Sequence, residues 1–411
     1  MLNKLAELSD TKKKALSIIL IAAAGVIIYS NTFDASFHFD DTLAIVENYA
    51  IHRFDIKEIF STSSRPILDM TFALNYYFGK LDVFGYHLVN IMLHIANGIL
   101  LYFILLWTIN PTHPCPVSPD YIGTNGEGDV RVTHRMPLYA SLIFIAHPIQ
   151  TQAVTYIVSR SSVLSATFYL LALLLFIRAF RASNSSLVPR LSSLVPRPSS
   201  LYLIGAFLSS CLGMGTKQET ATLPLMLLIY DFFFISKGDW KALKGHYKVH
   251  LVMFSTLAIV LYLSFSGLQT YISLDYAKGV PMPQEGSITS FQYFLTQLHV
   301  IPYYIKLLFI PTNLNLDYDW PITRNIDLQT ILFFVLLTFI VVVAIKLYRK
   351  ASLISFGIIW FFVTLSVTSS FIVIFDVIFE HRLYLPSIGF AIVMAFMISR
   401  ISNLKIGKSF D

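Results

Sequence analysis

The chain has 411 residues. Hydrophobic residues make up 55% and charged residues only 13%, whereas about 25% charged residues is usual in soluble proteins. This composition excludes a soluble enzyme, a disordered chain, a collagen and a coiled-coil fibre, and it indicates a polytopic membrane protein.

Ten apolar runs follow one another along the sequence. The first, Ala15 to Tyr29, comes after three lysines and is followed by no small-residue cleavage site, so it predicts a transmembrane helix rather than a signal peptide. The others predict spans over residues 87–108, 134–157, 162–180, 201–216, 220–236, 249–267, 328–347, 352–372 and 385–400. We therefore expect one domain over 1–411, an all-α bundle of about ten transmembrane helices.

Positive charge separates the two faces of this predicted bundle. Twenty of the 30 Lys and Arg residues fall in the segments assigned to the cytosol, which carry a net charge of +12, and the outer segments carry −6. Connections rich in Lys and Arg stay on the cytosolic side, so we predict that both termini are cytosolic. The overall charge of +6 then reflects orientation and calls for no nucleic-acid partner.

The segments between the spans differ in character. Two are long and lie outside: the first outer loop, 31–86, and the large outer loop, 268–327. Phe291 to Pro311 in the latter is apolar but carries polar residues, which predicts an amphipathic helix that lies in the interface or is re-entrant. The cytosolic loop 109–133 is rich in Pro and Gly, and the insert 181–200 is of low complexity.

Adjacent carboxylates in the first outer loop are candidates for proton transfer. Asp40 and Asp41 come about ten residues after the first span ends. Two neighbouring negative charges disfavour each other, so one carboxylate can serve as a base. The alternative is that an Asp caps the short helix predicted to begin at Thr42.

Glu380, His381, Arg382 and Tyr384 lie at the outer mouth of the last span. Arg382 is the only cation of that loop, and the guanidinium fork suits a phosphate. The alternative is an arginine that reaches to lipid headgroups, with Tyr384 as an interfacial aromatic residue.

Other outer cations are isolated as well. Lys217 and Glu219 make up most of a three-residue connection, which is consistent either with an anion contact at Lys217 or with an ion pair that holds a turn. Arg65 and Arg160 are lone cations of outer segments. Asp317 and Asp319 form a D-x-D pattern, a weak indication of a metal site that a solvated turn explains better.

Six blocks of the sequence, in order, resemble a known family. They are FHFDDTLAIVENYAI with SSRPILDMTFALNYYFGKLDVFGYHLVNIMLHIANGILLY, then AHPIQTQAVTYIVSRSSVLSA, TKQETATLPLMLLIYDFFF, YYIKLLFIPTNLNLDYDWPI and EHRLYLPSIGF. They are similar to the membrane domain of the GT-C glycosyltransferases, in particular the transmembrane and tetratricopeptide-repeat O-mannosyltransferases and their bacterial relatives. The resemblance implies a GT-C-like bundle. No 34-residue period is present, so we expect no tetratricopeptide repeats here.

The resemblance also implies a reaction and roles for particular residues. A sugar, with mannose expected, would pass from a polyprenyl-phosphate donor to a hydroxyl acceptor such as Ser or Thr of a protein, with inversion, on the periplasmic or lumenal side. We favour Asp41 as the base and Asp40 as the acceptor-orienting residue, the reverse order being open. Donor phosphate binding is expected of Arg382, Lys217 and Arg65. Supporting roles fall to His381, Glu380, Glu219, Arg160 and Tyr384.

Some features of the reaction stay open in the sequence. No cofactor is expected, and a divalent metal is not assigned because a donor with a single phosphate does not require one. A lipid or solute transporter and a non-catalytic scaffold are the alternative functions. Transporters usually place ionisable residues inside their spans, whereas here the charges gather at the outer mouth. The identity of the sugar, the oligomeric state, and the choice between a bacterial inner membrane and the endoplasmic reticulum are not determined by the sequence.

Overall fold

The computed structural model describes residues 9–109, 130–183, 198–265, 288–374 and 376–407. Within these ranges the chain is helical and contains no strand, which confirms the all-α prediction. The cytosolic loop and the insert predicted at 109–133 and 181–200 lie largely outside the described residues, as does the start of the large outer loop.

The described helices begin and end as follows. The first half contains α2 (Asp10–Tyr29), α3 (Tyr49–Arg53), α4 (Ile56–Thr62), α5 (Pro66–Gly79), α6 (Val83–Ile109), α8 (Val130–Ala146), α9 (Thr151–Thr155) and α10 (Arg160–Ser183). The second half contains α11 (Pro198–Met214), α12 (Leu223–Tyr230), α13 (Trp240–Gly245), α14 (Tyr247–Ser255), α16 (Ser290–Phe309), α17 (Leu328–Leu347), α18 (Ser352–Leu365) and α19 (Ser387–Gly407).

Among the described residues, five helical segments are long and apolar enough to cross a membrane. They are Asp10–Thr32, Val83–Ile109, Ile157–Ala182, Tyr247–Phe265 and Leu328–Leu347. Four of the other predicted spans correspond to shorter apolar helices, at Arg135–Ala146, Ser199–Met214, Ser352–Leu365 and Ser387–Ile401. The structure therefore describes a membrane protein, and the number of ten spans stays a prediction.

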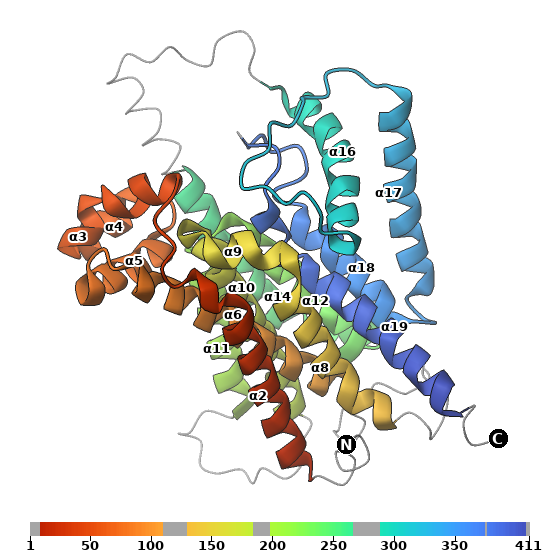
Figure 1. The fold of residues 1–411 in the computed structure, drawn as a ribbon. Helices are drawn as coiled ribbons and strands as arrows, with labels where there is room; N and C mark the ends of the chain where they lie inside the picture. The colour runs from red at the N-terminus through yellow and green to blue at the C-terminus, as the bar shows by residue number, and fades with distance from the viewer. Residues whose placement is uncertain (1–8, 110–129, 184–197, 266–287, 375, 408–411) are drawn as a thin grey trace.

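Large apolar side chains on α17 face outward, as expected of a helix in contact with lipid. The exposed residues on this helix include Leu328, Ile331, Leu332, Phe334, Val335 and Phe339. In Figure 1, α2 begins and α19 ends on the lower side, whereas α3, α4, α5 and α16 lie toward the upper side.

One predicted span is shorter in the structure than in the sequence analysis. Helix α8 ends at Ala146, not near residue 157. Pro148 follows, and the residue before a proline is driven out of the helical region; His147 accordingly has extended backbone, with ψ of 127°. Residues 148–159 form a 3-10 turn, the short α9 and a second turn, Ile157–Ser159. This segment lies beside the first outer loop rather than continuing a span.

Helix α16 confirms the helix predicted between Phe291 and Pro311. A capping box starts it, in which Thr289 and Gln292 each bond the backbone of the other. The helix packs against α17 and runs alongside it in Figure 1. Whether it lies in the membrane interface or is re-entrant stays a prediction.

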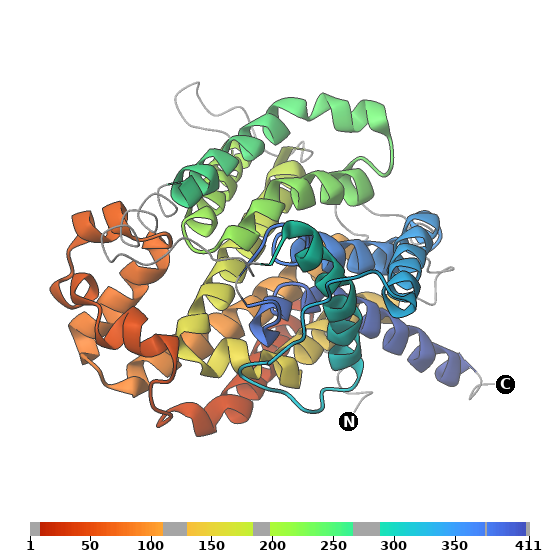
Figure 2. The ribbon, with the colours of Figure 1, turned by 90° about the horizontal axis from the view of Figure 1, so that it is seen from above.

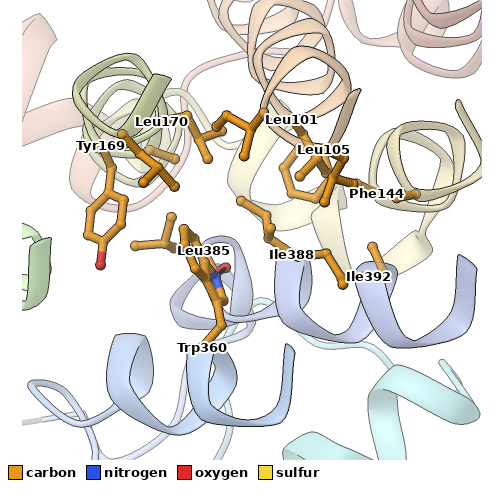
Figure 3. Close-up of a cluster of buried hydrophobic side chains, with 14 of the residues drawn as sticks. Leu101, Leu105, Phe144, Tyr169, Leu170, Trp360, Leu385, Ile388 and Ile392 are labelled. Atoms are coloured by element: carbon orange, nitrogen blue, oxygen red, sulfur yellow. Dashed lines mark hydrogen bonds between the residues drawn. The ribbon is translucent and has the colours of Figure 1, made fainter. Parts of the chain in front are cut away.

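A central hydrophobic core holds the outer segments in place. Trp360 of α18 is fully buried in a cluster of apolar side chains from α6, α8, α10, α19 and the residues just before α19 (Figure 3). The cluster includes Leu101, Leu105, Phe144, Tyr169, Leu170, Leu385, Ile388 and Ile392. The Trp360 indole N–H donates to the carbonyl of Leu385 at 2.9 Å. This bond fixes the chain shortly after Arg382, the residue predicted to bind a phosphate. Seen from above in Figure 2, the helices α3, α4 and α5 occupy one side and α16 and α17 the other, with residues 147–160 between them.

Helices α18 and α19 pack so closely that a side chain at Gly389 is excluded. A Cβ atom built there would lie 2.2 Å from the carbonyl oxygen of Gly357. We expect Gly389→Ala to destabilise the protein by about 1–3 kcal/mol, because the added methyl group forces the two backbones apart. The measurement is the thermal unfolding midpoint in detergent. Gly245→Ala is the matched control, since its Cβ would meet no atom within 4 Å; equal midpoints for the two variants would contradict this packing.

Candidate functional site

Asp41 is a buried residue that fastens the first outer loop. Its side chain, 1% exposed, accepts hydrogen bonds from the backbone N–H groups of Val158 at 2.7 Å and His38 at 3.1 Å. Burial raises the pKa of this carboxyl, and the two N–H donors oppose that shift. The carboxylate makes no capping bond to the turn that begins at Thr42, so the capping interpretation is wrong for Asp41.

Asp40 differs from its neighbour because it is exposed. Its backbone N–H donates to the hydroxyl of Tyr156 at 2.9 Å. The preceding residue, Phe39, has a φ of 46°, a left-handed conformation that is rare and strained for an aromatic residue. The carboxylate of Asp40 interacts electrostatically with Arg65 and Asp376. The strained turn therefore presents one carboxylate to solvent while the next is buried.

The loop that carries Arg65 is joined to the loop that carries Lys217. The backbone N–H of Ile67 donates to the carbonyl of Gly215 at 3.2 Å. A Cβ on Gly215 would lie 2.8 Å from Cγ1 of Ile67, so glycine permits this approach. Burial lowers the pKa of Arg65, and the charges of Glu219, Asp69 and Asp40 oppose that shift. Two cations distant in the sequence thus come to one place.

Lys217 and Glu219 form an ion pair, which confirms the turn-holding interpretation of the two residues. The Nζ of Lys217 lies 3.2 Å from Oε2 of Glu219 and donates to the hydroxyl of Ser162 at 2.6 Å. The hydroxyl of Ser165 donates to the other Glu219 oxygen at 3.0 Å. Burial lowers the pKa of Lys217 to about 8, with Glu219 opposing and Arg65 and Arg382 adding to the effect.

Arg382 is buried, with 4% of its surface exposed. Its Nη2 donates to the backbone carbonyl of Asp376, and the guanidinium lies 5.6 Å from the ring centre of Phe379. Its Nη1 is buried and has no hydrogen-bond partner within the described ranges, where Arg382 also forms no ion pair. An arginine that reaches to headgroups would be exposed, so that interpretation is wrong. Buried polar groups are nearly always bonded, and this one is available for an anion.

The charges of three cations act on His381. Its pKa lies well below the usual value because the ring is desolvated and because Lys217, Arg382 and Arg65 all repel a proton there. We call Arg65, Lys217 and Arg382 the cation cluster. The ring stacks on Phe379 with centres 5.0 Å apart, and the backbone N–H donates to the Oε1 of Gln152 at 2.6 Å.

Glu380 holds the large outer loop against this site. Its Oε1 accepts from the hydroxyl of Tyr318 at 2.5 Å and from the backbone N–H of Asn315 at 2.6 Å. Burial raises the pKa of Glu380. Asp317 and Asp319 on either side of Tyr318 are exposed, as expected of a solvated turn. In the part of the chain that is described, no three His, Cys, Asp or Glu residues are grouped as metal ligands.

Arg160 and Tyr384 serve the packing of the bundle. Arg160 is fully buried and donates to oxygens of Asn90, Thr71, Asn75 and Tyr86. These bonds engage all three guanidinium nitrogens within the protein. The acceptors are all neutral. The Tyr384 hydroxyl bonds the ring of His94 at 2.7 Å and accepts from Asn97 at 3.0 Å. Tyr384 is therefore a core residue, not an interfacial aromatic.

Three residues at the site were not identified from the sequence. Gln152 connects His381 to the carbonyl of Leu316, and Tyr156 and Ser162 contact Asp40 and Lys217. The signal that could have revealed the first two is Pro148, which ends α8 and places the following polar residues in a connection rather than in a span.

Comparisons with known proteins give relatives of one kind. The chain is 26% identical to the Homo sapiens protein O-mannosyl-transferase TMTC3 over an alignment of 426 positions, which covers 95% of this chain and 43% of that protein. It is 24% identical to the Mus musculus TMTC3, covering 98% of this chain and 44% of the relative. It is 31% identical to the Xenopus laevis protein O-mannosyl-transferase tmtc2 over 53% of this chain and 24% of the relative.

The chain is a homologue of protein O-mannosyl-transferases. This confirms the resemblance seen in the sequence blocks. The chain spans less than half the length of the three relatives named. No protein-family model matches it, and no solved structure matches it.

Proposed function

We propose that this chain is a glycosyltransferase that moves mannose from a polyprenyl-phosphate donor to a Ser or Thr hydroxyl of a protein, with inversion. The transfer takes place on the extracytoplasmic side of the membrane, at the end where the cation cluster lies. Its relatives are named protein O-mannosyl-transferases, which supports the sugar and the acceptor. The observation that carries the proposal is the convergence of Arg65, Lys217 and Arg382, with an unpartnered, buried Nη1 on Arg382.

The cation cluster suits a leaving phosphate. Sugar transfer passes through an oxocarbenium-like state in which negative charge grows on the leaving oxygen. Cations that are already fixed in a poorly hydrated site stabilise such charge without reorganisation. The carbonyl of Asp376 holds one end of the Arg382 guanidinium, which leaves Nη1 for a phosphate oxygen. The ammonium of Lys217 is held in place by its ion pair with Glu219 and its hydrogen bond to Ser162.

Asp40 is the better candidate for the base, which reverses the order favoured from the sequence. Both oxygens of Asp41 are occupied by backbone N–H donors, so its role is to hold the loop. Asp40 is exposed and interacts electrostatically with Arg65 of the cation cluster. A base must reach the acceptor hydroxyl before its protonation matters. Asp40 is accessible to an acceptor, and Tyr156 bonds its backbone.

The test is transfer of labelled mannose from polyprenyl-phosphate mannose to a Ser/Thr peptide by the purified full chain in lipid. The expected result is a mannosylated peptide with inverted anomeric configuration. Movement of the lipid-linked sugar across the bilayer without any product would contradict the proposal and favour a transporter.

A pH profile tests the role of Lys217. Because its pKa is about 8, the ammonium is present below that pH and is lost above it. We therefore expect kcat/KM, which reports the free enzyme, to fall as the pH rises through about 8. Lys217→Arg should move this fall to higher pH, since guanidinium stays protonated. A profile that is the same in both proteins would exclude Lys217 as the titrating group.

A further inference from the structure

His381 is a neutral residue among cations, and one of its nitrogens lacks a partner. Its Nδ1 is buried and makes no hydrogen bond to any residue that the structure describes. A buried polar atom left without a partner costs about 1–3 kcal/mol. The stack on Phe379 and the backbone bond to Gln152 hold the residue and the plane of its ring in place.

A second unpartnered atom belongs to the adjacent residue. The Nη1 of Arg382 is also buried and unbonded within the described ranges, and that side chain is 4% exposed. Two neighbouring side chains thus each leave a buried nitrogen unsatisfied, and the charges of Lys217 and Arg65 also act on the His381 ring. An anion bound here would supply an acceptor to Arg382, and to His381 once its ring carries a second proton.

We propose that His381 is a fourth contact to the donor phosphate, and that its imidazole takes up one proton from solvent when the phosphate binds. This inference rests on the proposed function and names a proton-coupled step within it. The charges of Lys217, Arg382 and Arg65 repel a proton from the ring. A bound phosphate offsets those charges and offers an oxygen that an imidazolium N–H can donate to.

The other titratable groups around His381 are less able to take up that proton. Arg382 is already a cation, and Lys217 is mostly protonated below its pKa of about 8. Glu219 is paired with Lys217, and Glu380 is bonded to Tyr318 and Asn315. Asp69 and Asp40 act on Arg65 rather than on the ring.

The added proton has a catalytic consequence. An imidazolium beside Arg382 provides a further charge-assisted hydrogen bond to the leaving phosphate, whose negative charge increases as the sugar departs. A neutral ring avoids a further positive charge beside Lys217 and Arg382 until an anion offsets it. No bond to the histidine is made or broken apart from that to the proton.

The test is calorimetry of farnesyl methyl phosphate binding to the full chain in lipid nanodiscs, in two buffers of different ionisation enthalpy. The single charge of this phosphodiester does not change near neutral pH, so any proton taken up enters the protein. We expect uptake of up to one proton, and an affinity that weakens as the pH rises, by at most about tenfold per pH unit.

Variants assign the proton to the ring. His381→Gln should abolish the uptake and the pH dependence while weaker binding persists. The control, His299→Gln, changes a histidine that bonds Thr330 between α16 and α17 and should leave the uptake unchanged. Binding by the unaltered protein without proton uptake would overturn this inference alone. Failure to bind the probe at all would overturn the donor assignment as well.

Discussion

Asp40→Asn is expected to reduce kcat/KM for mannose transfer by about 10²–10⁴-fold, the usual contribution of a general base. The change removes the negative charge and keeps the shape of an exposed side chain, so the thermal unfolding midpoint should not move. The measurement is initial rates of peptide mannosylation beside a melting curve in the same detergent. Asp34→Asn, at an exposed carboxylate of the same loop, is the matched control and should keep full activity.

Asp41→Asn should give a different result. An amide still accepts one bond through its oxygen, but its NH2 group then faces a backbone N–H of Val158 or His38. Leaving such a buried donor unsatisfied costs about 1–3 kcal/mol, so the midpoint should fall. If Asp41→Asn instead abolished transfer at an unchanged midpoint while Asp40→Asn stayed active, the two roles would be the reverse of those proposed.

Arg382→Gln is expected to lower kcat/KM by about 10²–10³-fold, the effect of removing one donor from a site where charge develops. Stability should change little, because the variant removes a buried cation whose Nη1 has no partner in the described structure. Activity and the melting midpoint are measured together. Arg324→Gln, at an exposed arginine of the large outer loop, should behave as the unaltered protein.

Arg160→Gln, at another buried arginine, is expected to lower the stability of the protein, unlike Arg382→Gln. Its guanidinium satisfies oxygens of Asn90, Asn75 and Tyr86, so its loss should lower the midpoint more than the loss of Arg382 does. A lower midpoint for Arg382→Gln than for Arg160→Gln would show that Arg382 is a structural residue and would contradict its assignment to the donor phosphate.

The two arginines show the limit of a sequence taken alone. Each is a lone cation in an outer segment, and nothing nearby in the chain separates them. In the folded chain Arg160 meets neutral oxygens from α5 and α6. Arg382 bonds the carbonyl of Asp376 and interacts with the hydroxyl of Tyr293, and its Nη1 has no hydrogen-bond partner among the described residues. The difference arises from segments up to about 90 residues away in the chain for Arg160, which local pattern does not encode.

The same reason explains the adjacent aspartates. The sequence shows two adjacent carboxylates, Asp40 and Asp41, in the first outer loop. Only the approach of residues 156–158 buries Asp41 and leaves Asp40 exposed. The extent of the predicted span at 134–157 was wrong for a local reason, since Pro148 in the sequence already marks the end of α8.

The helical class, the apolar runs and the ordered blocks that relate this chain to protein O-mannosyl-transferases can be read from the sequence. These features follow from composition and from patterns that extend over a few turns of helix. Which charges influence one another depends on the folded chain, in which Arg65, Lys217 and Arg382, from three distant segments, all act on His381. Burial and hydrogen bonding are set by such long-range packing, and they separate a cation available to a ligand from one that the protein has already satisfied.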